Sequence, residues 1–158
     1  MYWQLTEDIY WGDYKAVEEL KDEVGSVICV ATNKDLERIG YNVFSLPPKV
    51  RYFRFAEKDK SFPDYEYISS LEGLIEISLL YRPLLVHCFA GQHRSPIIAI
   101  LASLIAYNKK NRESEYYFDR RLYNSFIEKV KKLNPLCDEC WNFDYSRTVQ
   151  KWIESRIL

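Results

Sequence analysis

The chain has 158 residues, with 22 basic and 23 acidic side chains and a formal net charge of -1 at pH 7. This length suits one domain over residues 1–158, and the balanced charge gives no sign of a surface for nucleic acid or membrane. No apolar run approaches the length of a membrane span. The N-terminal residues lack the basic start and apolar stretch of a signal peptide, so a cytoplasmic protein with reduced thiols is expected.

Short apolar runs alternate with helical patterns along the chain. The expected strands are 27–31, 50–55 and 84–88, and the expected helices are 13–23, 64–81, 95–107, 114–133 and 143–157. Segment 95–107 is almost wholly apolar, which predicts a buried central helix. The alternation predicts an α/β fold, a three-layer sandwich in which helices flank a central, mostly parallel sheet.

The most informative segment follows the expected strand 84–88 and reads His87-Cys88-Phe89-Ala90-Gly91-Gln92-His93-Arg94-Ser95. Five residues separate Cys88 from Arg94, so the backbone can curl and point successive amides inward at an anion. Gly91 is able to adopt a positive φ. Arg94 can hold two phosphate oxygens, and the helix expected from Ser95 adds the partial positive charge of its N-terminus. The pattern predicts a phosphate-binding loop made of Phe89, Ala90, Gly91, Gln92, His93 and Arg94.

The same surroundings favour the thiolate of Cys88, because cations and helix N-termini stabilise a negative sulfur. Such a thiolate is suited to in-line attack on a phosphoryl group, with Arg94 and the loop amides stabilising the charge that develops. Ser95 can donate a hydrogen bond that makes the sulfur a better leaving group. His87 is expected to orient the loop rather than to act as the base. Cys29, in contrast, is expected to be an inert buried thiol.

These residues resemble the signature of the cysteine-dependent protein phosphatases, which is His-Cys, five residues, Arg, then Ser or Thr. The small dual-specificity branch is the most similar, and segments 9–16 and 52–59 resemble its opening strand and the strand before its general-acid loop. The resemblance implies Cys88 as nucleophile, Arg94 as phosphate ligand and Ser95 as a group that assists hydrolysis. It further implies a monomer without metal or organic cofactor that hydrolyses phosphotyrosine in proteins, with phosphoserine and phosphothreonine as further candidate substrates, through a cysteinyl-phosphate intermediate.

Three carboxylates lie in the polar segment that corresponds to the general-acid loop: Glu57, Asp59 and Asp64. The reaction needs an acid that protonates the leaving oxygen and then activates water. Spacing from the preceding strand favours Asp59 for this role. Asp64 immediately precedes the next helix and is expected to cap it.

Two other functions stay open from the sequence. A phosphatase-like module that captures phosphoproteins without turnover would share the fold, although such domains generally lose the cysteine, the arginine or the acid. A phosphatase for RNA 5′ ends or phosphoinositides would need more cationic side chains than this loop offers.

Cys137 and Cys140 form a lone Cys-x-x-Cys pattern. A zinc site would usually need a second pair of ligands, and both histidines of the chain, His87 and His93, belong to the expected loop. A local disulfide or two unpaired thiols is therefore expected here, and no metal site.

Overall fold

Five strands form one sheet in the computed structural model, which describes residues 1–39, 46–55, 64–111, 113, 116–137, 141 and 143–157. The strands are β1 (Tyr2–Thr6), β2 (Ile9–Gly12), β3 (Ser26–Cys29), β4 (Arg51–Arg54) and β5 (Leu84–His87). The helices are α1 (Ala16–Leu20), α2 (Asn33–Ile39), α3 (Tyr65–Ser78), α4 (Arg94–Lys110), α5 (Arg120–Leu133) and α7 (Asp144–Ser155).

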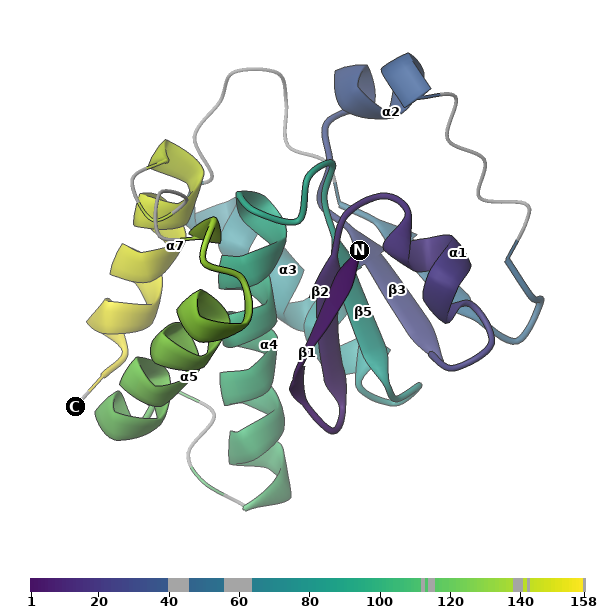
Figure 1. Ribbon diagram of the computed structural model, residues 1–158. Coiled ribbons are helices and arrows are strands. Elements are labelled where there is room, and N and C mark those ends of the chain that lie inside the picture. The colour runs from purple at the N-terminus through teal and green to yellow at the C-terminus, as the bar shows by residue number, and fades with distance from the viewer. Residues whose placement is uncertain are drawn as a thin grey trace.

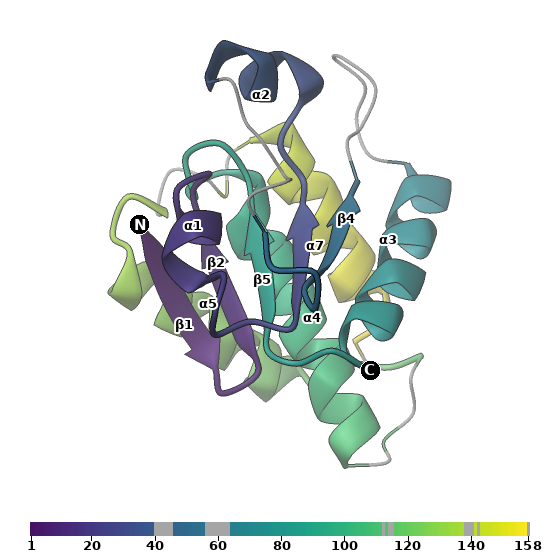
Figure 2. The ribbon, with the colours of Figure 1, turned by 90° about the vertical axis from the view of Figure 1, so that its right-hand side faces the viewer.

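The strands follow the order β1-β2-β5-β3-β4, which Figure 2 shows across the sheet. All neighbours are parallel except β1, which pairs antiparallel with β2. The expectation of a mostly parallel sheet is therefore confirmed. Strand β1 was not expected; it is mostly accessible to solvent and reaches the sheet through a hairpin with β2.

Side chains of β5 alternate between two cores, as the period of a strand requires. Leu84 and Val86 lie in the core formed with α3, α4, α5 and α7, whereas Leu85 packs with Val17 and Leu20 of α1. Figure 1 shows α1 on one side of the sheet and these four helices on the other. The three-layer arrangement predicted from the sequence is confirmed.

Helix α4 is buried along nearly its whole length and contacts β2, β5, α3, α5 and α7. It corresponds to the expected central helix 95–107, and it starts one residue earlier, at Arg94. Ser95 and Pro96 are thus its second and third residues. Proline is compatible with this first turn, because the amides there have no acceptor within the helix.

Two of the expected helices lose the most residues relative to their sequence patterns. The pattern over 114–133 becomes helix only at Arg120, because the side chain of Asp119 accepts the backbone amide of Leu122 at 2.8 Å and caps the helix there. The pattern over 13–23 is helical over Ala16–Leu20. Helix α2 was not expected. None of the helices in the described ranges is long and apolar enough to cross a bilayer.

Candidate active site

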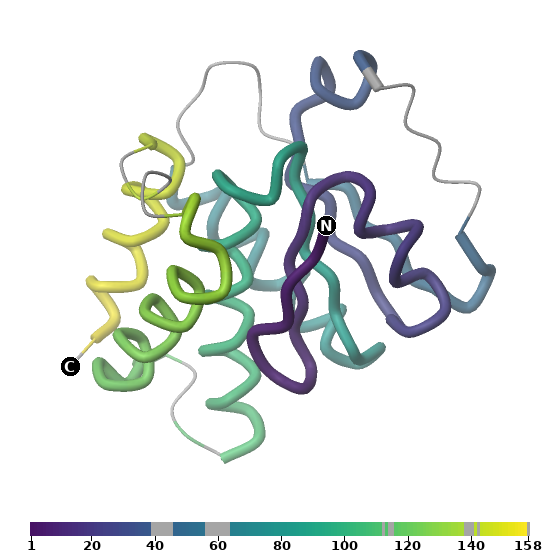
Figure 3. Tube along the Cα trace, in the orientation of Figure 1, coloured from purple at the N-terminus to yellow at the C-terminus, as the bar shows by residue number. Residues whose placement is uncertain are grey.

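The predicted phosphate loop connects β5 to α4 at the carboxyl edge of the parallel strands. The turn after β2 supports it: the amide of Cys88 donates to the Gly12 carbonyl at 3.3 Å, and the amide of Tyr14 donates to the Phe89 carbonyl at 3.3 Å. Figure 3 shows these two chain segments side by side. Strand pairing between β2 and β5 brings them together, because Gly12 is in register with His87.

Gly91 adopts a φ of 72°, as the sequence predicted for the middle of the loop. A Cβ at this position would lie 2.9 Å from the amide nitrogen of Asp13, from the carbonyl carbon of Gly12 and from the ring of Trp3. Both the conformation and the space therefore require glycine.

The sulfur of Cys88 lies inside the loop, and the residue is 3% exposed. The amide of Gly91 donates to the sulfur at 3.2 Å, and the hydroxyl oxygen of Ser95 lies 3.2 Å from it. A donor aimed at the sulfur stabilises a negative charge there. These contacts place one backbone donor and one hydroxyl group beside the sulfur of Cys88.

The hydroxyl of Ser95 has two acceptors within reach, because it also lies 3.2 Å from the carbonyl of Gly12. A hydroxyl has one proton, so it donates either to Gly12 or to the sulfur of Cys88. A neutral thiol leaves the proton to Gly12, whereas a thiolate attracts it. Ser95 can therefore follow the charge of the sulfur by rotating its hydroxyl.

His87 is fully buried at the end of β5. Its Nδ1 lies 3.3 Å from the carbonyl oxygen of Cys88, and because a carbonyl can only accept, Nδ1 carries the proton. Burial lowers the pKa of His87 to about 4, so the ring is neutral near pH 7. A neutral donor to the loop backbone supports the predicted orienting role.

The low pKa of His87 predicts that acid destabilises the fold. The unfolded chain binds a proton near pH 6.5 and the folded chain only near pH 4, so stability is lost as the pH falls through this window. The loss should reach on the order of 3 kcal/mol. Urea unfolding between pH 7.5 and pH 4 should show a weaker pH dependence for His87→Asn than for the wild type. His93→Gln should keep most of it, because the ring of His93 is only partly shielded from solvent; equal pH dependence in the wild type and His87→Asn would contradict the assignment.

Arg94 closes the loop and rests on helix α7. Its guanidinium carbon lies 5.1 Å from the ring centre of Tyr145, and the hydroxyl of Ser146 donates to the carbonyl of His93 at 2.9 Å. The sequence prediction missed both α7 residues, because tyrosine and serine in an amphipathic helix carry no signal of such contacts.

Two aromatic pairs flank the loop. Phe89 stacks on Tyr14 with ring centres 5.4 Å apart and planes at 23°. The ring centres of His93 and Phe143 lie 4.2 Å apart. Burial and the neighbouring charge of Arg94 lower the pKa of His93, which keeps its ring neutral near pH 7. The mouth of the loop is therefore aromatic more than cationic.

Asp59 and Glu57 lie outside the described residues, so their distances from Cys88 stay untested. The residues on either side are described. Phe55 follows β4, and its amide donates to the carbonyl of Cys29 at 2.8 Å. Asp64 accepts the amide of Tyr67 at 2.8 Å and caps α3, which confirms the role predicted for it.

The other cysteines differ in their surroundings. Cys29 is fully buried in β3, in register with His87, and burial raises the pKa of its thiol, in keeping with an unreactive group. Cys137 is also fully buried, and its sulfur lies 4.0 Å from the carbonyl oxygen of Gly91. Cys140 lies outside the described residues, so a pairing with Cys137 stays untested.

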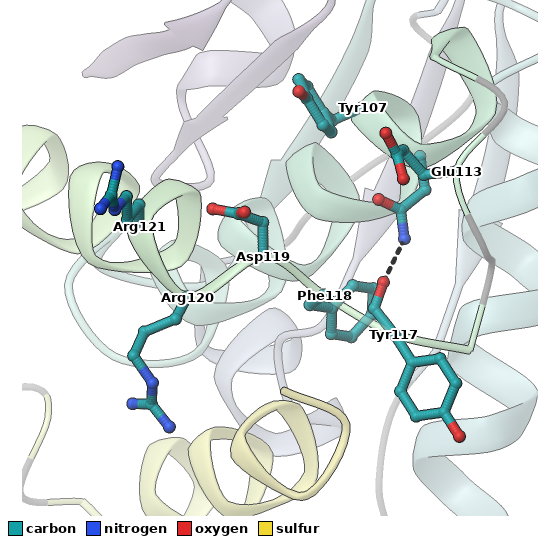
Figure 4. A pocket seen from close by; sticks show the side chains of 8 residues that line it. Tyr107, Glu113, Tyr117, Phe118, Asp119, Arg120 and Arg121 are labelled. Atoms are coloured by element: carbon teal, nitrogen blue, oxygen red, sulfur yellow. Dashed lines mark hydrogen bonds between the residues drawn. The ribbon is translucent and has the colours of Figure 1, made fainter. Parts of the chain in front are cut away.

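A separate cavity of about 480 Å³ lies near the far end of α4, away from Cys88. Figure 4 shows Tyr107, Glu113 and Asp119 around it, with Arg120 directed away. Its charges are mixed, and the carboxylate of Asp119 is already engaged as the cap of α5. The residues that line it include no cysteine.

No protein-family model and no curated protein matches the sequence. Solved structures do match the fold. Tk-PTP in its active form has a TM-score of 0.67 at 16% identity, covering 98% of this chain and 96% of that one. The human tyrosine phosphatase-like serine/threonine/tyrosine-interacting protein matches with a TM-score of 0.64 at 16% sequence identity, covering 96% of this chain and 95% of that one. A mouse putative dual specificity phosphatase matches with a TM-score of 0.60 at 16% sequence identity, covering 98% of this chain and 87% of that one. In agreement with the resemblance of the Cys88 loop, the chain therefore has the fold of the small tyrosine and dual-specificity phosphatases.

Proposed function

We propose that this protein is a cysteine-dependent phosphatase that hydrolyses phosphotyrosine in proteins. The Cys88 thiolate attacks phosphorus, and the bond to the leaving oxygen breaks while Asp59 protonates that oxygen. Asp59 then takes a proton from water, which attacks the cysteinyl phosphate and releases the thiolate. Arg94 and the loop amides hold the phosphate oxygens throughout.

One observation carries the proposal: the sulfur of Cys88 lies within 3.2 Å of both the Gly91 amide and the Ser95 hydroxyl, inside a loop that Arg94 closes. A buried cysteine with a purely structural role needs none of these groups. The likeness of the fold to that of solved phosphatases supports the same chemistry.

The aromatic pair at the mouth favours phosphotyrosine over phosphoserine. Tyr14 and Phe89 stack on each other beside the nucleophile and are both partly exposed, so part of their ring surface is accessible to a phenyl ring. A phosphoserine side chain has no ring to make this contact. We infer that preference for an aryl phosphate arises at this pair.

The role of Asp59 predicts a specific change in the pH profile. A general acid must be protonated, so wild-type activity should fall on the basic side of the optimum, and Asp59→Asn should lose this basic limb. The turnover of phosphotyrosine should drop by about 10²- to 10⁴-fold. Turnover of a substrate with a better leaving group, p-nitrophenyl phosphate, should drop less, because its leaving oxygen needs little protonation.

Two neighbouring carboxylates serve as matched controls for this experiment. Glu57→Gln removes a charge from the same segment, and Asp64→Asn keeps a side chain able to cap α3. Both should retain the basic limb. If Glu57→Gln removes it and Asp59→Asn does not, the acid is Glu57.

The alternative is a module that binds phosphoproteins without turnover. One structural neighbour is a tyrosine phosphatase-like interacting protein, which gives this possibility a concrete precedent for the fold. Binding of a phosphotyrosine peptide by the wild type, with no phosphate released over hours, would favour it over the phosphatase.

A further inference from the structure

We propose that Tyr145 is the positioning residue for Arg94 and that Tyr67 fixes its ring in place. The inference rests on the proposed function, in which Arg94 binds the phosphate of the substrate. The two tyrosines act through the arginine rather than on the sulfur of Cys88. Their effect is to orient the guanidinium before substrate arrives, which reduces the ordering required on binding.

The contact between Tyr145 and Arg94 is of the cation–π type. The guanidinium carbon lies 5.1 Å from the ring centre, and Tyr145 is only 6% exposed. A cation over an aromatic face is attracted by the ring, and more strongly where water is excluded. Aromatic rings are preferred partners of the planar, delocalised guanidinium group.

A hydrogen-bonded pair fixes the ring of Tyr145. Its hydroxyl lies 3.0 Å from that of Tyr67, which in turn donates to the carbonyl of Phe55 at 3.2 Å. A phenol has one proton, and that of Tyr67 goes to the carbonyl, so Tyr145 donates to Tyr67. The two rings also meet edge to face at 6.1 Å and 81°. The hydrogen bond of its hydroxyl and the contact between the two rings together orient the side chain of Tyr145.

The next residue of α7 reinforces the arrangement. Ser146 donates to the carbonyl of His93, directly before Arg94, at 2.9 Å. The first turn of α7 therefore contacts two consecutive loop residues, the backbone of His93 and the side chain of Arg94. Packing of α7 against α4 thus determines how the loop presents its arginine.

Tyr67 connects this support to the general-acid side of the site. Its hydroxyl binds the carbonyl of Phe55, and its amide donates to the carboxylate of Asp64. These two residues stand on either side of segment 56–63. Tyr67 therefore contacts both flanks of that segment, and it is linked to Arg94 through Tyr145.

The test measures oxyanion binding without turnover. In a Cys88→Ser background, titration calorimetry with tungstate should show that Tyr145→Leu weakens binding by about tenfold, whereas Tyr145→Phe, which keeps the ring, weakens it by less than about threefold. With Cys88 intact, Tyr145→Leu should raise KM for p-nitrophenyl phosphate by a similar factor. Rescue by phenylalanine separates an effect of the ring from loss of the hydroxyl.

Tyr123→Leu is the matched control. Tyr123 is 2% exposed and belongs to the same hydrophobic core, but it lies in α5 rather than in the helix whose tyrosine faces Arg94. Both leucine variants should lower the melting temperature, but only Tyr145→Leu should weaken tungstate binding. Equal tungstate affinity in Tyr145→Leu and the parent would overturn the inference.

A double-mutant cycle keeps the proposal testable if Tyr145→Leu does not fold. Tyr67→Phe and Tyr145→Phe break the same hydroxyl contact, so together they should reduce tungstate affinity by less than the product of their separate factors. Independent factors would overturn the link through Tyr67. Failure of the Cys88→Ser parent itself to bind tungstate would contradict the proposed function, and with it this inference.

Discussion

Replacing Cys88 by serine should abolish hydrolysis of p-nitrophenyl phosphate while the fold and phosphate binding remain. A serine hydroxyl at this position is far less ionised than a thiol, so no nucleophile is present at neutral pH. The loss should be at least about 10⁴-fold, within the range seen when other enzymes lose their nucleophile. Steady-state assays without added metal and with a reductant, together with thermal unfolding, measure both quantities.

A trapping experiment distinguishes the covalent route from direct attack of water on phosphorus. Rapid acid quenching followed by mass spectrometry should find one added phosphoryl group on the peptide that contains Cys88, and none in Cys88→Ser. The control is Cys29→Ser, which changes a buried thiol in β3 that has no place in the proposed reaction. It should retain turnover and the trapped intermediate. Substantial activity in Cys88→Ser would refute the nucleophile assignment.

Gly91→Ala should damage stability and activity together. Its φ of 72° costs an alanine about 1–2 kcal/mol, and the added methyl group would lie 2.9 Å from backbone atoms of Gly12 and Asp13. Overpacking of this kind costs about 1–3 kcal/mol more. Because the Gly91 amide donates to the sulfur, the resulting shift should also lower kcat/KM by more than about tenfold. Urea unfolding and steady-state kinetics provide the two measurements.

Gly73→Ala is the matched control, because a Cβ at Gly73 would meet no atom within 4 Å. Gly73 lies inside α3, where alanine is the better helix former, so the change should stabilise the protein by about 0.5–1 kcal/mol. Its activity should equal that of the wild type. Similar effects of the two substitutions would show that the conformation of the loop does not matter.

The mostly parallel character of the sheet and the residues of the Cys88 loop could be predicted from the sequence, whereas strand β1 could not. The residues from His87 to Ser95 are contiguous, so their spacing along the chain already decides which groups surround the sulfur. Successive side chains of a strand point to opposite faces of the sheet, so neighbouring residues in sequence enter different cores. Leu84 and Val86 lie in one core and Leu85 in the other for this reason. Asp64 could be recognised as a cap for the same reason, since capping involves residues three apart.

The contacts that support the loop could not be predicted from the sequence, because they join helices that are far apart along the chain. The chain has 13 tyrosines, and the sequence around Tyr67 and Tyr145 does not distinguish these two from the others. Tyr145 reaches Arg94 because α7 packs on α4, and Tyr67 reaches Tyr145 because α3 packs against both. Local spacing determines a loop whose contacts are near in sequence, whereas contacts between helices depend on how several apolar faces pack together.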